Sequence, residues 1–400
     1  MTSPLIVQFS PRFLPLLGGP EIDISTIITK LNNYRYSIVA NSLTGIARYE
    51  ILAGNCDVWR VAPDDPFLSS QNGRAPWKLR VLYGSIAEIQ RQRAKIRLIR
   101  MLKPDLVHVR DIDGWNLLRI DNLLRTRFFE KWARQFASFK SLGCRLLLTK
   151  HYSFPAKRSP PNYLSLENYL LGQFDFVQCV DRHIFAETLS KLSHAGARVW
   201  FTPVYVDTEL FRPQPWRDGK NLVVGYVGRH DSDKGTNLFA TLANQSMEGI
   251  DFEVALSGSN REINDFKALL SVKGKKNTTI HENVAHDLLP KFFQNVDVLL
   301  NPVETEGISR ATLEAMACGR PVIMTRLGDR RPVEDGRTGF LVESDPESVS
   351  HLLKDLREDR DNLMDLGRRA REIVHKTYGA SASMARQQAV YETVLRSGGG

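Results

Sequence analysis

Short apolar runs alternate with amphipathic segments along almost the whole chain, and this alternation is the strongest constraint on its fold. Apolar runs of strand length that are separated by helical segments predict parallel strands with helices on both faces, which is an α/β fold. Strands are expected at Leu5–Phe9, Ser37–Asn41, Val58–Val61, Leu106–Val109, Arg145–Leu148, Phe176–Val180 and Val199–Thr202, and then at Leu222–Val227, Phe252–Leu256, Val296–Leu300, Val322–Met324 and Phe340–Val342. Helices are expected at Ile86–Leu102, Phe128–Ser141, Ile184–Ser193, Gly235–Gln245, Arg261–Ser271, Asp287–Gln294, Arg310–Ala317 and Ala380–Leu395.

The length of the chain indicates two domains. Its 400 residues are too many for one ordinary hydrophobic core. The segment Pro203–Asp218 contains three prolines and shows no periodicity, which marks it as the boundary. We therefore expect one domain over residues 1–203 and a second over 204–379, with a last helix in 380–397.

Composition favours a soluble globular protein. Apolar residues make up 42% and charged residues 25% of the chain. No run approaches the roughly 20 apolar residues that a membrane-spanning helix needs. The N-terminus lacks a basic region and is interpreted as a first strand, not as a signal peptide. The four cysteines lie far apart without a C-x-x-C pair, so disulfides and zinc are not expected, and a cytoplasmic location fits.

The positive charge is concentrated in the first half of the chain. Residues 1–203 contain 28 Lys and Arg against 16 Asp and Glu, whereas the remainder contains 26 against 29. The density is highest from Arg74 to Lys103, where nine basic residues face one acid, Glu88. Further basic residues follow at Arg119, Arg125, Arg127, Lys131 and Arg134. Two interpretations stay open, a solvated helix face or contact with an anionic membrane surface or lipid-linked acceptor. Nucleic acid is not expected, because no binding motif accompanies the charge.

Two carboxylates mark the most informative segment of the second half, Glu306 to Glu314. Glu306 follows a predicted strand that ends at Pro302, and Glu314 lies in the first turns of the next predicted helix. In open α/β sheets, ligands bind at this carboxyl edge of the strands. The helix N-terminus adds partial positive charge there. The segment therefore indicates an anionic ligand with many hydroxyl groups, to which carboxylates can accept hydrogen bonds.

Two further loops follow predicted strands. Arg229 and Lys234 flank a turn after the first strand of the second half, where two cations could hold a diphosphate. An exposed loop with ordinary charges is an equally good interpretation of this stretch alone. Gly18 and Gly19 follow the first strand and precede a helix, where backbone N–H groups could approach a phosphate. By itself, this pair is also explained by a plain turn.

Histidines and acidic pairs give weaker signals. His151 directly follows a predicted strand and is favoured over His108 as a functional residue, although a lone histidine is more often structural. Asp111 and Asp113 have D-x-D spacing, which could hold a divalent metal, but Arg229 and Lys234 already offer neutralisation of phosphate without one. H-E-x-x-H, Walker A, EF-hand and G-x-S-x-G patterns do not occur in the sequence.

In this order and spacing, the motifs resemble those of the retaining, nucleotide-sugar-dependent glycosyltransferases of family 4, over nearly the whole chain. Gly18-Gly19 resembles the early glycine-rich loop of that family, and His151 its strand-end histidine. Val206–Pro213 resembles V-D-x-x-x-F-x-P between the domains. Gly228–Gly235 resembles G-R-x-x-x-x-K-G, and Glu306–Glu314, which runs on into Ala-Met-Ala-Cys-Gly-Arg-Pro-Val, resembles E-x7-E.

The resemblance implies a GT-B fold, two Rossmann-like domains that face each other across a cleft, with the helix in 380–397 crossing back to the N-terminal domain. The N-terminal domain would lie on the acceptor side, and 204–379 would bind the donor. The implied reaction transfers a hexose-type sugar from a UDP- or GDP-sugar to a hydroxyl of a lipid-linked or cell-envelope glycan acceptor, with retention of configuration. It needs neither a metal nor another cofactor. The protein would be cytoplasmic, and peripheral on the inner face of the membrane.

The resemblance also implies a role for each matching residue. Arg229 and Lys234 would bind the donor diphosphate, with Gly19 adding a backbone N–H. The backbone of Ile308 and Ser309 would contact sugar hydroxyls. Glu306 and His151 would lie near the donor sugar, and Glu314 would accept from the ribose hydroxyls. The two glutamates are therefore expected to hold the donor and not to act as the acid and nucleophile of a glycoside hydrolase.

The sequence departs from the family pattern at three places. Glu306 is followed by Gly-Ile-Ser where Gly-Phe-Gly is usual, Val204-Tyr-Val-Asp replaces N-G-V-D, and Gly328-Asp329 replaces a glycine pair. These departures bear on the choice of sugar, and Asp329 and Arg330 are expected to shape the sugar pocket. Two alternatives are a sugar-nucleotide epimerase of the same fold and a non-catalytic homologue that binds a partner. The presence of Arg229, Lys234 and Glu314 argues against both.

Overall fold

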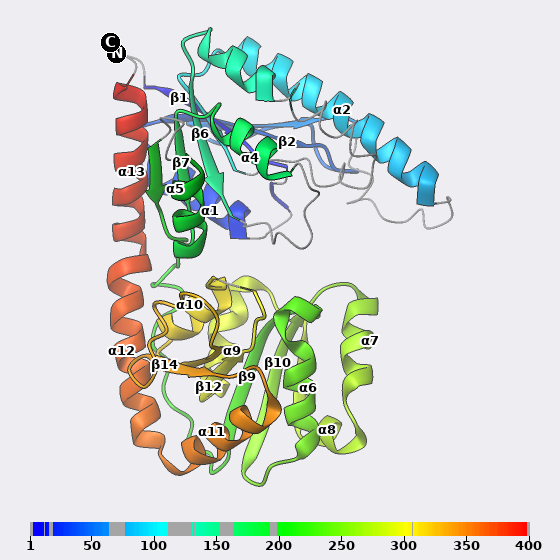
Figure 1. Ribbon diagram of the computed structural model, residues 1–400, viewed down its shortest axis with the longest axis vertical. Coiled ribbons are helices and arrows are strands. Elements are labelled where there is room, and N and C mark those ends of the chain that lie inside the picture. Colours follow the sequence, from blue (N-terminus) through cyan, green and yellow to red (C-terminus); the bar gives the residue numbers. More distant parts are fainter. Residues whose placement is uncertain are drawn as a thin grey trace. The chain divides into compact units, whose positions relative to one another are not determined.

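The chain forms two compact units, each with its own parallel sheet. The computed structural model describes residues 3–11, 13–15, 19–63, 77–110, 130, 133–151, 163–192, 198–305 and 307–397. Unit 1 comprises Met1–Pro203 and Met384–Gly400, and unit 2 comprises Val204–Ser383. The boundary lies at the start of the proline-containing segment, and the chain returns to unit 1 inside its last helix (Figure 1).

Unit 1 is built on an eight-stranded sheet with the order β3-β4-β2-β1-β5-β6-β7-β8, in which only β3 and β4 pair antiparallel. Its strands are β1 (Leu5–Phe9), β2 (Arg35–Asn41), β3 (Tyr49–Ala53), β4 (Cys56–Val61), β5 (Leu106–Val109), β6 (Arg145–Lys150), β7 (Phe176–Cys179) and β8 (Arg198–Phe201). Its helices include α1 (Gly19–Lys30), α2 (Trp77–Leu102), α4 (Tyr163–Leu171), α5 (Arg182–Leu192), one over residues 133–140, and α13 (Ala380–Arg396).

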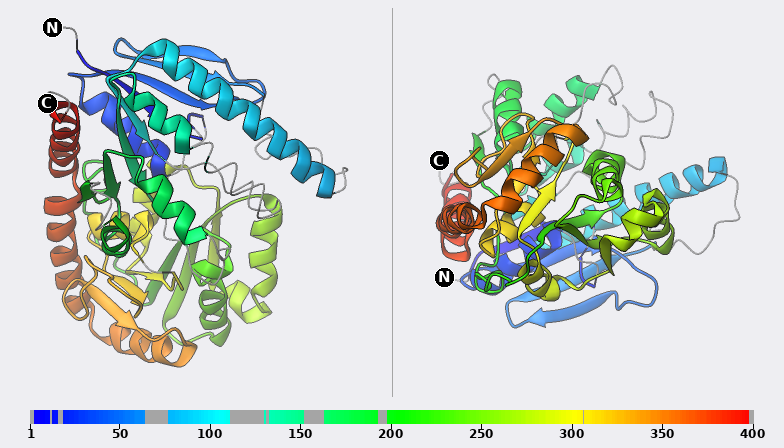
Figure 2. Two further views of the ribbon diagram at one scale, coloured as in Figure 1. Left: turned by 45° about the horizontal axis from the view of Figure 1, so that its top comes forward. Right: turned by 90° about the horizontal axis from the view of Figure 1, so that it is seen from below.

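Both faces of this sheet are covered by helices, as the alternating strands and helices predict. On one face, α2, the helix over 133–140, α4 and α5 bury side chains such as Ile99 and Phe136 against Val7 and Val107. On the other face, α1 and α13 cover the strands. The long helix α2 lies on the outside of the unit (Figure 2).

Unit 2 has a six-stranded sheet with the order β11-β10-β9-β12-β13-β14, and all of its strand pairs are parallel. The strands are β9 (Leu222–Arg229), β10 (Ile250–Ser257), β11 (Thr278–Glu282), β12 (Val298–Asn301), β13 (Val322–Thr325) and β14 (Gly339–Val342). The helices are α6 (Thr236–Gln245), α7 (Asn260–Leu269), α8 (Val272–Lys276), α9 (Leu289–Asn295), α10 (Arg310–Ala317), α11 (Pro346–Glu358) and α12 (Arg360–Tyr378), with 3-10 turns η3 (Ser232–Lys234) and η4 (His286–Leu288).

Residues that alternate along the central strands of unit 2 point to opposite faces. Leu299 packs with α9, α10 and α12, whereas its neighbours Val298 and Leu300 pack with α6, α7 and α11. Such strands, buried on both faces, are continuous apolar runs in sequence. The predicted strands are therefore confirmed, with ends that differ by at most two residues. The sequence missed β3 and β11, which lie at sheet edges.

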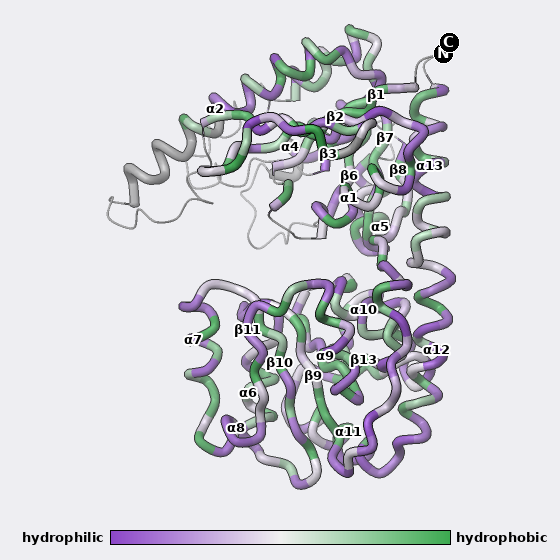
Figure 3. Tube along the Cα trace, turned by 180° about the vertical axis from the view of Figure 1, so that it is seen from behind, coloured by the Kyte–Doolittle hydropathy of each residue, from purple (hydrophilic) through white to green (hydrophobic). Residues whose placement is uncertain are grey.

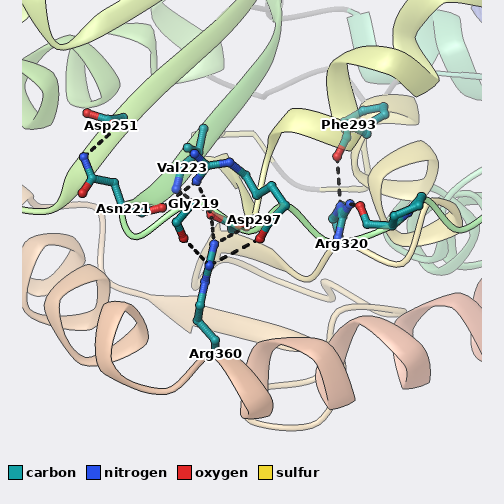
Figure 4. Close-up of polar contacts among 10 residues, drawn as sticks. Gly219, Asn221, Val223, Asp251, Phe293, Asp297, Arg320 and Arg360 are labelled. Atoms are coloured by element: carbon teal, nitrogen blue, oxygen red, sulfur yellow. Dashed lines mark hydrogen bonds and ion pairs between the residues drawn. The ribbon is translucent and has the colours of Figure 1, made fainter.

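Four arginines fasten the proline-containing segment to unit 2. They donate to backbone carbonyls along it, at 2.6 Å from Arg310 to Tyr205, 3.0 Å from Arg371 to Thr208, 2.8 Å from Arg320 to Pro215 and 3.4 Å from Arg360 to Arg217. The fully buried carboxylate of Asp297 accepts from the Val223 amide at 2.9 Å and pairs with Arg360 at 3.0 Å (Figure 4). The segment is thus an integral part of unit 2, fixed near the amino ends of β9 and β12.

Candidate functional site

The predicted donor-binding residues of unit 2 lie where its strand order reverses. From β9 the chain proceeds outward to β10 and β11, and from the adjacent β12 it proceeds the other way to β13 and β14. The loops after β9 and β12 therefore lie at this switch point, at the carboxyl ends of the strands, which is where open α/β sheets bind ligands. Arg229 is the last residue of β9, and Lys234 ends η3 in the loop that follows it. Ile308 and Ser309 belong to the loop after β12.

The loop after β9 is held tightly against the loop after β12. Gly235 has φ of +68°, and a Cβ there would lie 1.9 Å from the carbonyl oxygen of Pro302, so only glycine fits. The amide of Glu304 donates to the carbonyl of Asp233 at 3.1 Å. At the other side of the turn, His230 Nδ1 lies 2.8 Å from the Thr236 hydroxyl. These contacts fix the backbone that carries the two cations.

Arg229 and Lys234 form a concentration of positive charge at this edge. Burial and the neighbouring Arg229 guanidinium lower the pKa of Lys234, and Asp231 and Asp233 offset this only in part. Among the residues that the structure describes, neither Arg229 nor Lys234 forms an ion pair. Charge–charge repulsion between two cations is relieved when an anion binds both of them. The lowered pKa of Lys234 fits the predicted anion site, which itself stays a prediction.

The loop after β12 ends in a capped helix. Ser309 is the N-cap of α10 and its hydroxyl accepts from the Thr312 amide at 3.1 Å. The buried Asn301 amide donates to the same Ser309 hydroxyl at 2.8 Å and to the Thr312 hydroxyl at 2.6 Å. Ile308 packs against the core. The side chains of Ile308 and Ser309 are thus used in the fold, and their proposed contact with a ligand would be through the backbone.

Arg330 holds the backbone of the loop after β12 through hydrogen bonds from its guanidinium group. Its Nη1 donates to the carbonyls of Thr305 and Gly307, both at 2.8 Å, and its Nη2 donates to Val303 at 3.1 Å. The guanidinium is almost fully buried. These contacts fix the backbone on either side of position 306, and the expected effect of Arg330 on a sugar pocket stays a prediction. Glu306 itself, Gly18, and the Asp111–Asp113 pair fall outside the described residues.

Glu314 is buried in the middle of α10. Its Oε1 lies 2.7 Å from Nε2 of His286, at the start of η4 in the segment that follows β11. Sequence reasoning did not single out His286. The available signal was its place shortly after a strand, but β11 was itself not predicted.

Comparison with known proteins agrees with this geometry. Residues 221–359 match the family model of the glycosyl transferases group 1. The D-inositol 3-phosphate glycosyltransferase of Paenarthrobacter aurescens is 31% identical over 204 residues, which cover 46% of this chain and 50% of that protein. The capsular polysaccharide biosynthesis glycosyltransferase CapM of Staphylococcus aureus is 27% identical over 185 residues, 45% of this chain and 48% of CapM. The match thus spans about half the length of each relative.

One solved structure matches a larger share of this chain than these relatives do. Sucrose-phosphate synthase from Thermosynechococcus elongatus superposes with a TM-score of 0.76 at 17% identity, over 98% of this chain and all of that one. The chain therefore has the GT-B fold, and its residues 221–359 are similar to the glycosyl transferases group 1. The predicted α/β class and GT-B fold are therefore confirmed.

Two of the predicted donor-binding residues lie in unit 1. Gly19 begins α1, and His151 directly follows β6 and is half-buried. His108, the less favoured histidine, is completely buried in β5, with Nδ1 2.9 Å from the Tyr391 hydroxyl and Nε2 2.6 Å from that of Thr149. Burial, Arg110 and His151 hold its pKa well below the usual range, so it is a neutral structural group. The donor contacts of Gly19 and His151 stay predictions.

The part of the chain that the structure describes contains no candidate metal site. Within the described ranges, His, Cys, Asp and Glu side chains do not gather in groups of three or more that could hold a metal ion. Independence from metal remains a prediction about the reaction, to be tested by assay. No helix in the described part of the chain combines the length and apolarity that a membrane crossing requires.

Proposed function

We propose that the chain is a retaining glycosyltransferase that moves a hexose-type sugar from a UDP- or GDP-sugar to an acceptor hydroxyl. The observation that carries the proposal is the concentration of positive charge formed by Arg229 and Lys234 at the reversal of the unit 2 sheet, with Lys234 destabilised as a cation in the absence of an anion. A nucleoside diphosphate supplies that anion. The family model covers this same part of the chain.

In this proposal, each group acts on a distinct part of the donor. Arg229 and Lys234 bind the diphosphate and stabilise the charge that develops as the bond between the sugar and the diphosphate breaks. Glu314 accepts from the ribose hydroxyls. The backbone of Ile308 and Ser309 and the side chain of Glu306 contact the sugar. His151 and the backbone N–H of Gly19 are assigned to the donor by the resemblance alone.

The proposed reaction keeps the configuration of the anomeric carbon. The bond between that carbon and the diphosphate oxygen breaks, and the acceptor oxygen forms its bond on the same face of the sugar. The proton of the acceptor hydroxyl passes to the departing diphosphate, so the products are a glycoside and a protonated nucleoside diphosphate. No protein carboxylate is needed as a nucleophile, and metal is not required because Arg229 and Lys234 neutralise the leaving group.

Nucleotide binding and turnover test the proposal together. Thermal unfolding is measured with UDP and with GDP, and a panel of UDP- and GDP-sugars is assayed by mass spectrometry with and without glycan acceptors. We expect one nucleotide to raise Tm and one donor to be consumed, with activity retained in EDTA and an anomeric configuration by NMR that matches the donor. Lys234→Ala and Glu314→Ala should abolish transfer, whereas Lys220→Ala, an exposed lysine at the other end of β9, should not.

The alternatives give different outcomes in the same assay. An epimerase converts the donor without any acceptor, and a non-catalytic homologue binds nucleotide without turnover. Absence of stabilisation by millimolar UDP or GDP would contradict a UDP- or GDP-sugar donor.

The acceptor is proposed to be lipid-linked or part of a cell-envelope glycan. The name of CapM assigns that relative to capsular polysaccharide biosynthesis, which supports this class. In unit 1, Arg93, Arg97 and Arg100 are exposed at i, i+4 and i+7 on one face of α2, which we name the basic face. Polar and apolar residues alternate along this part of the helix (Figure 3).

Exposed apolar side chains lie beside the basic face. Met101 on α2 is 78% exposed, and Leu142, which follows the helix over 133–140, is 61% exposed. Arg100 donates to the Ser138 hydroxyl at 3.0 Å, so the two helices are neighbours. Arginines with exposed apolar groups between them suit the headgroup region of an anionic membrane. Arg91 and Lys95, which the sequence placed in the same cluster, are buried and do not contribute.

Vesicle sedimentation tests this contact. We expect the protein to sediment with vesicles of phosphatidylcholine and phosphatidylglycerol at low salt, and to be released at 0.5 M salt, because screening weakens exposed charge interactions. The double variant Arg93→Gln/Arg97→Gln should lose binding. The double variant Lys273→Gln/Lys275→Gln, which removes the same charge from an exposed site in unit 2, should keep it. Equal loss in both variants, or no binding at low salt, would contradict a peripheral membrane location.

A further inference from the structure

His286 and Glu314 form a contact that the proposed mechanism does not use. Nε2 of His286 lies 2.7 Å from Oε1 of Glu314, although 28 residues separate them in sequence. The Glu314 side chain is only 4% exposed. An ionised carboxylate can only accept hydrogen bonds, so Nε2 carries the hydrogen of this contact. One of the two carboxylate oxygens of Glu314 is therefore already engaged by the protein.

The imidazole is in turn held by the segment that begins unit 2. The ring of Phe211 packs edge-on against that of His286, with centroids 5.2 Å apart and an interplanar angle of 62°. Phe211 is buried, and its carbonyl accepts from Arg371 Nη1 at 2.9 Å. Phe211 is the aromatic residue of the Val206–Pro213 motif. The chain of contacts thus runs from this motif through His286 to the glutamate assigned to the ribose.

We propose that His286 is a positioning residue, which fixes the carboxylate plane of Glu314 so that its second oxygen accepts from the donor ribose. The inference rests on the proposed function, because it needs a ribose at Glu314. A carboxylate whose plane is fixed before the ligand arrives loses less freedom on binding than one that can rotate. His286 itself remains partly exposed, with 29% of its side chain accessible, and touches the ribose only through Glu314.

A positioning role for His286 and a purely structural ion pair predict different nucleotide affinities when His286 is removed. If His286 acts through Glu314 on the ribose hydroxyls, its removal matters only when those hydroxyls are present. If His286 only stabilises the fold, its removal weakens binding of every nucleotide to the same degree. The variant should also raise the KM for the donor sugar and leave kcat nearly unchanged, because diphosphate departure takes place at Arg229 and Lys234.

Calorimetry on the full chain separates the two roles. The probes are UDP and GDP, and then the 2′,3′-dideoxy form of whichever of them binds. For His286→Ala we expect affinity for the complete nucleotide to fall about tenfold, the size of one hydrogen bond to a charged group, and affinity for the dideoxy form to stay unchanged. His286→Gln, whose amide can donate, should recover part of the affinity. In a Glu314→Ala background, His286→Ala should have no further effect.

Controls keep the outcomes distinct. His351→Ala removes an exposed histidine on α11 and should change neither affinity. Wild-type protein that binds neither UDP nor GDP overturns the proposed function and this inference with it. Nucleotide binding that is unchanged in His286→Ala, or weakened equally for the complete and dideoxy forms, overturns the inference alone. If His286→Ala does not fold, the same comparison is made with His286→Gln and Phe211→Leu, for which weaker effects of the same selectivity are expected.

Discussion

Gly235 lies directly against Pro302: a Cβ at position 235 would come within 1.9 Å of the Pro302 carbonyl oxygen. Because φ at Gly235 is also +68°, a side chain there is unfavourable even without the contact. We expect Gly235→Ala to push the loop after β9 away from the loop after β12 and to displace Lys234. The free energy of unfolding should fall by about 2–4 kcal/mol, and nucleotide affinity should be lost.

A matched glycine separates the contact from the backbone strain. Gly336 has φ of +67°, and a Cβ there would meet nothing within 4 Å. Gly336→Ala should therefore cost only the strain, about 1 kcal/mol, and leave nucleotide binding intact. Thermal unfolding and calorimetry on both variants make the comparison. Equal loss of affinity in the two would show that the approach to Pro302 is not what positions Lys234.

The buried guanidinium of Arg330 gives a second prediction. Lysine cannot replace its fork, because a single ammonium cannot reach the carbonyls of Thr305 and Gly307 together with that of Val303. Arg330→Lys should lower kcat/KM about 10- to 100-fold through misplacement of the loop that carries Glu306, and should lower Tm. Initial rates on the identified donor and thermal unfolding check both effects.

The neighbouring arginine is the control for this change. Arg331 is exposed and hydrogen-bonds to Asp329. Arg331→Lys removes a similar fork from the surface and should leave both activity and Tm close to those of the wild type. Wild-type activity in Arg330→Lys would mean that the loop keeps its conformation without the guanidinium.

The central strands were predictable from sequence, whereas two of the four edge strands, β3 and β11, were not. Strands such as β1, β9 and β12 are buried on both faces and are therefore continuous apolar runs. β11 lies at the sheet edge, and its sequence, Thr-Thr-Ile-His-Glu, contains a single aliphatic residue. β3 pairs antiparallel at the other sheet's edge, and three of its residues are exposed apolar side chains. The apolar-run signal is weak in β11, whereas the edge strands β8 and β14 were still predicted from their apolar residues.

The residues of the candidate site were likewise predictable only in part. The sequence singled out Arg229, Lys234, Ser309 and Glu314 as candidates because each lies in a local motif at or after the end of a strand. Their supporting residues are distant in sequence. Arg330 contacts carbonyls 23 and 25 residues away. Pairings of this kind depend on how helices and loops pack, and no local pattern encodes them.

Lys234 is expected to destabilise the ligand-free protein. Burial and Arg229 lower its pKa, so the ammonium is less favourable in the folded than in the unfolded chain. This cost is present in full below the lowered pKa and disappears above the ordinary lysine value. At neutral pH, Lys234→Met should therefore raise Tm, by roughly 2–4 °C per kcal/mol of relieved cost, and abolish stabilisation by nucleotide. Lys273→Met, at an exposed position, should change neither. A lower Tm in Lys234→Met would contradict the argument.

His108 predicts how the stability of unit 1 depends on pH. It is fully buried, and burial first, then Arg110 and His151, hold its pKa well below the usual range. A histidine with a lowered folded pKa binds fewer protons in the folded than in the unfolded chain, so stability is lost as pH falls below about 6.5. From that value down to the lowered pKa, this group alone should reduce the free energy of unfolding by up to about 1.4 kcal/mol per pH unit.

The contribution of His108 is isolated by comparing how steeply stability falls with pH in the wild type and in a His108 variant. His108→Gln should lower stability at neutral pH, because the contacts with Tyr391 and Thr149 are disturbed, yet its stability should fall less steeply between pH 6.5 and 5. Urea unfolding across that range measures both slopes. His351→Gln, at an exposed position, should keep the wild-type slope. If His108→Gln also keeps that slope, His108 is protonated in the folded chain at pH 5, and the buried network around Tyr391 must accommodate a charge.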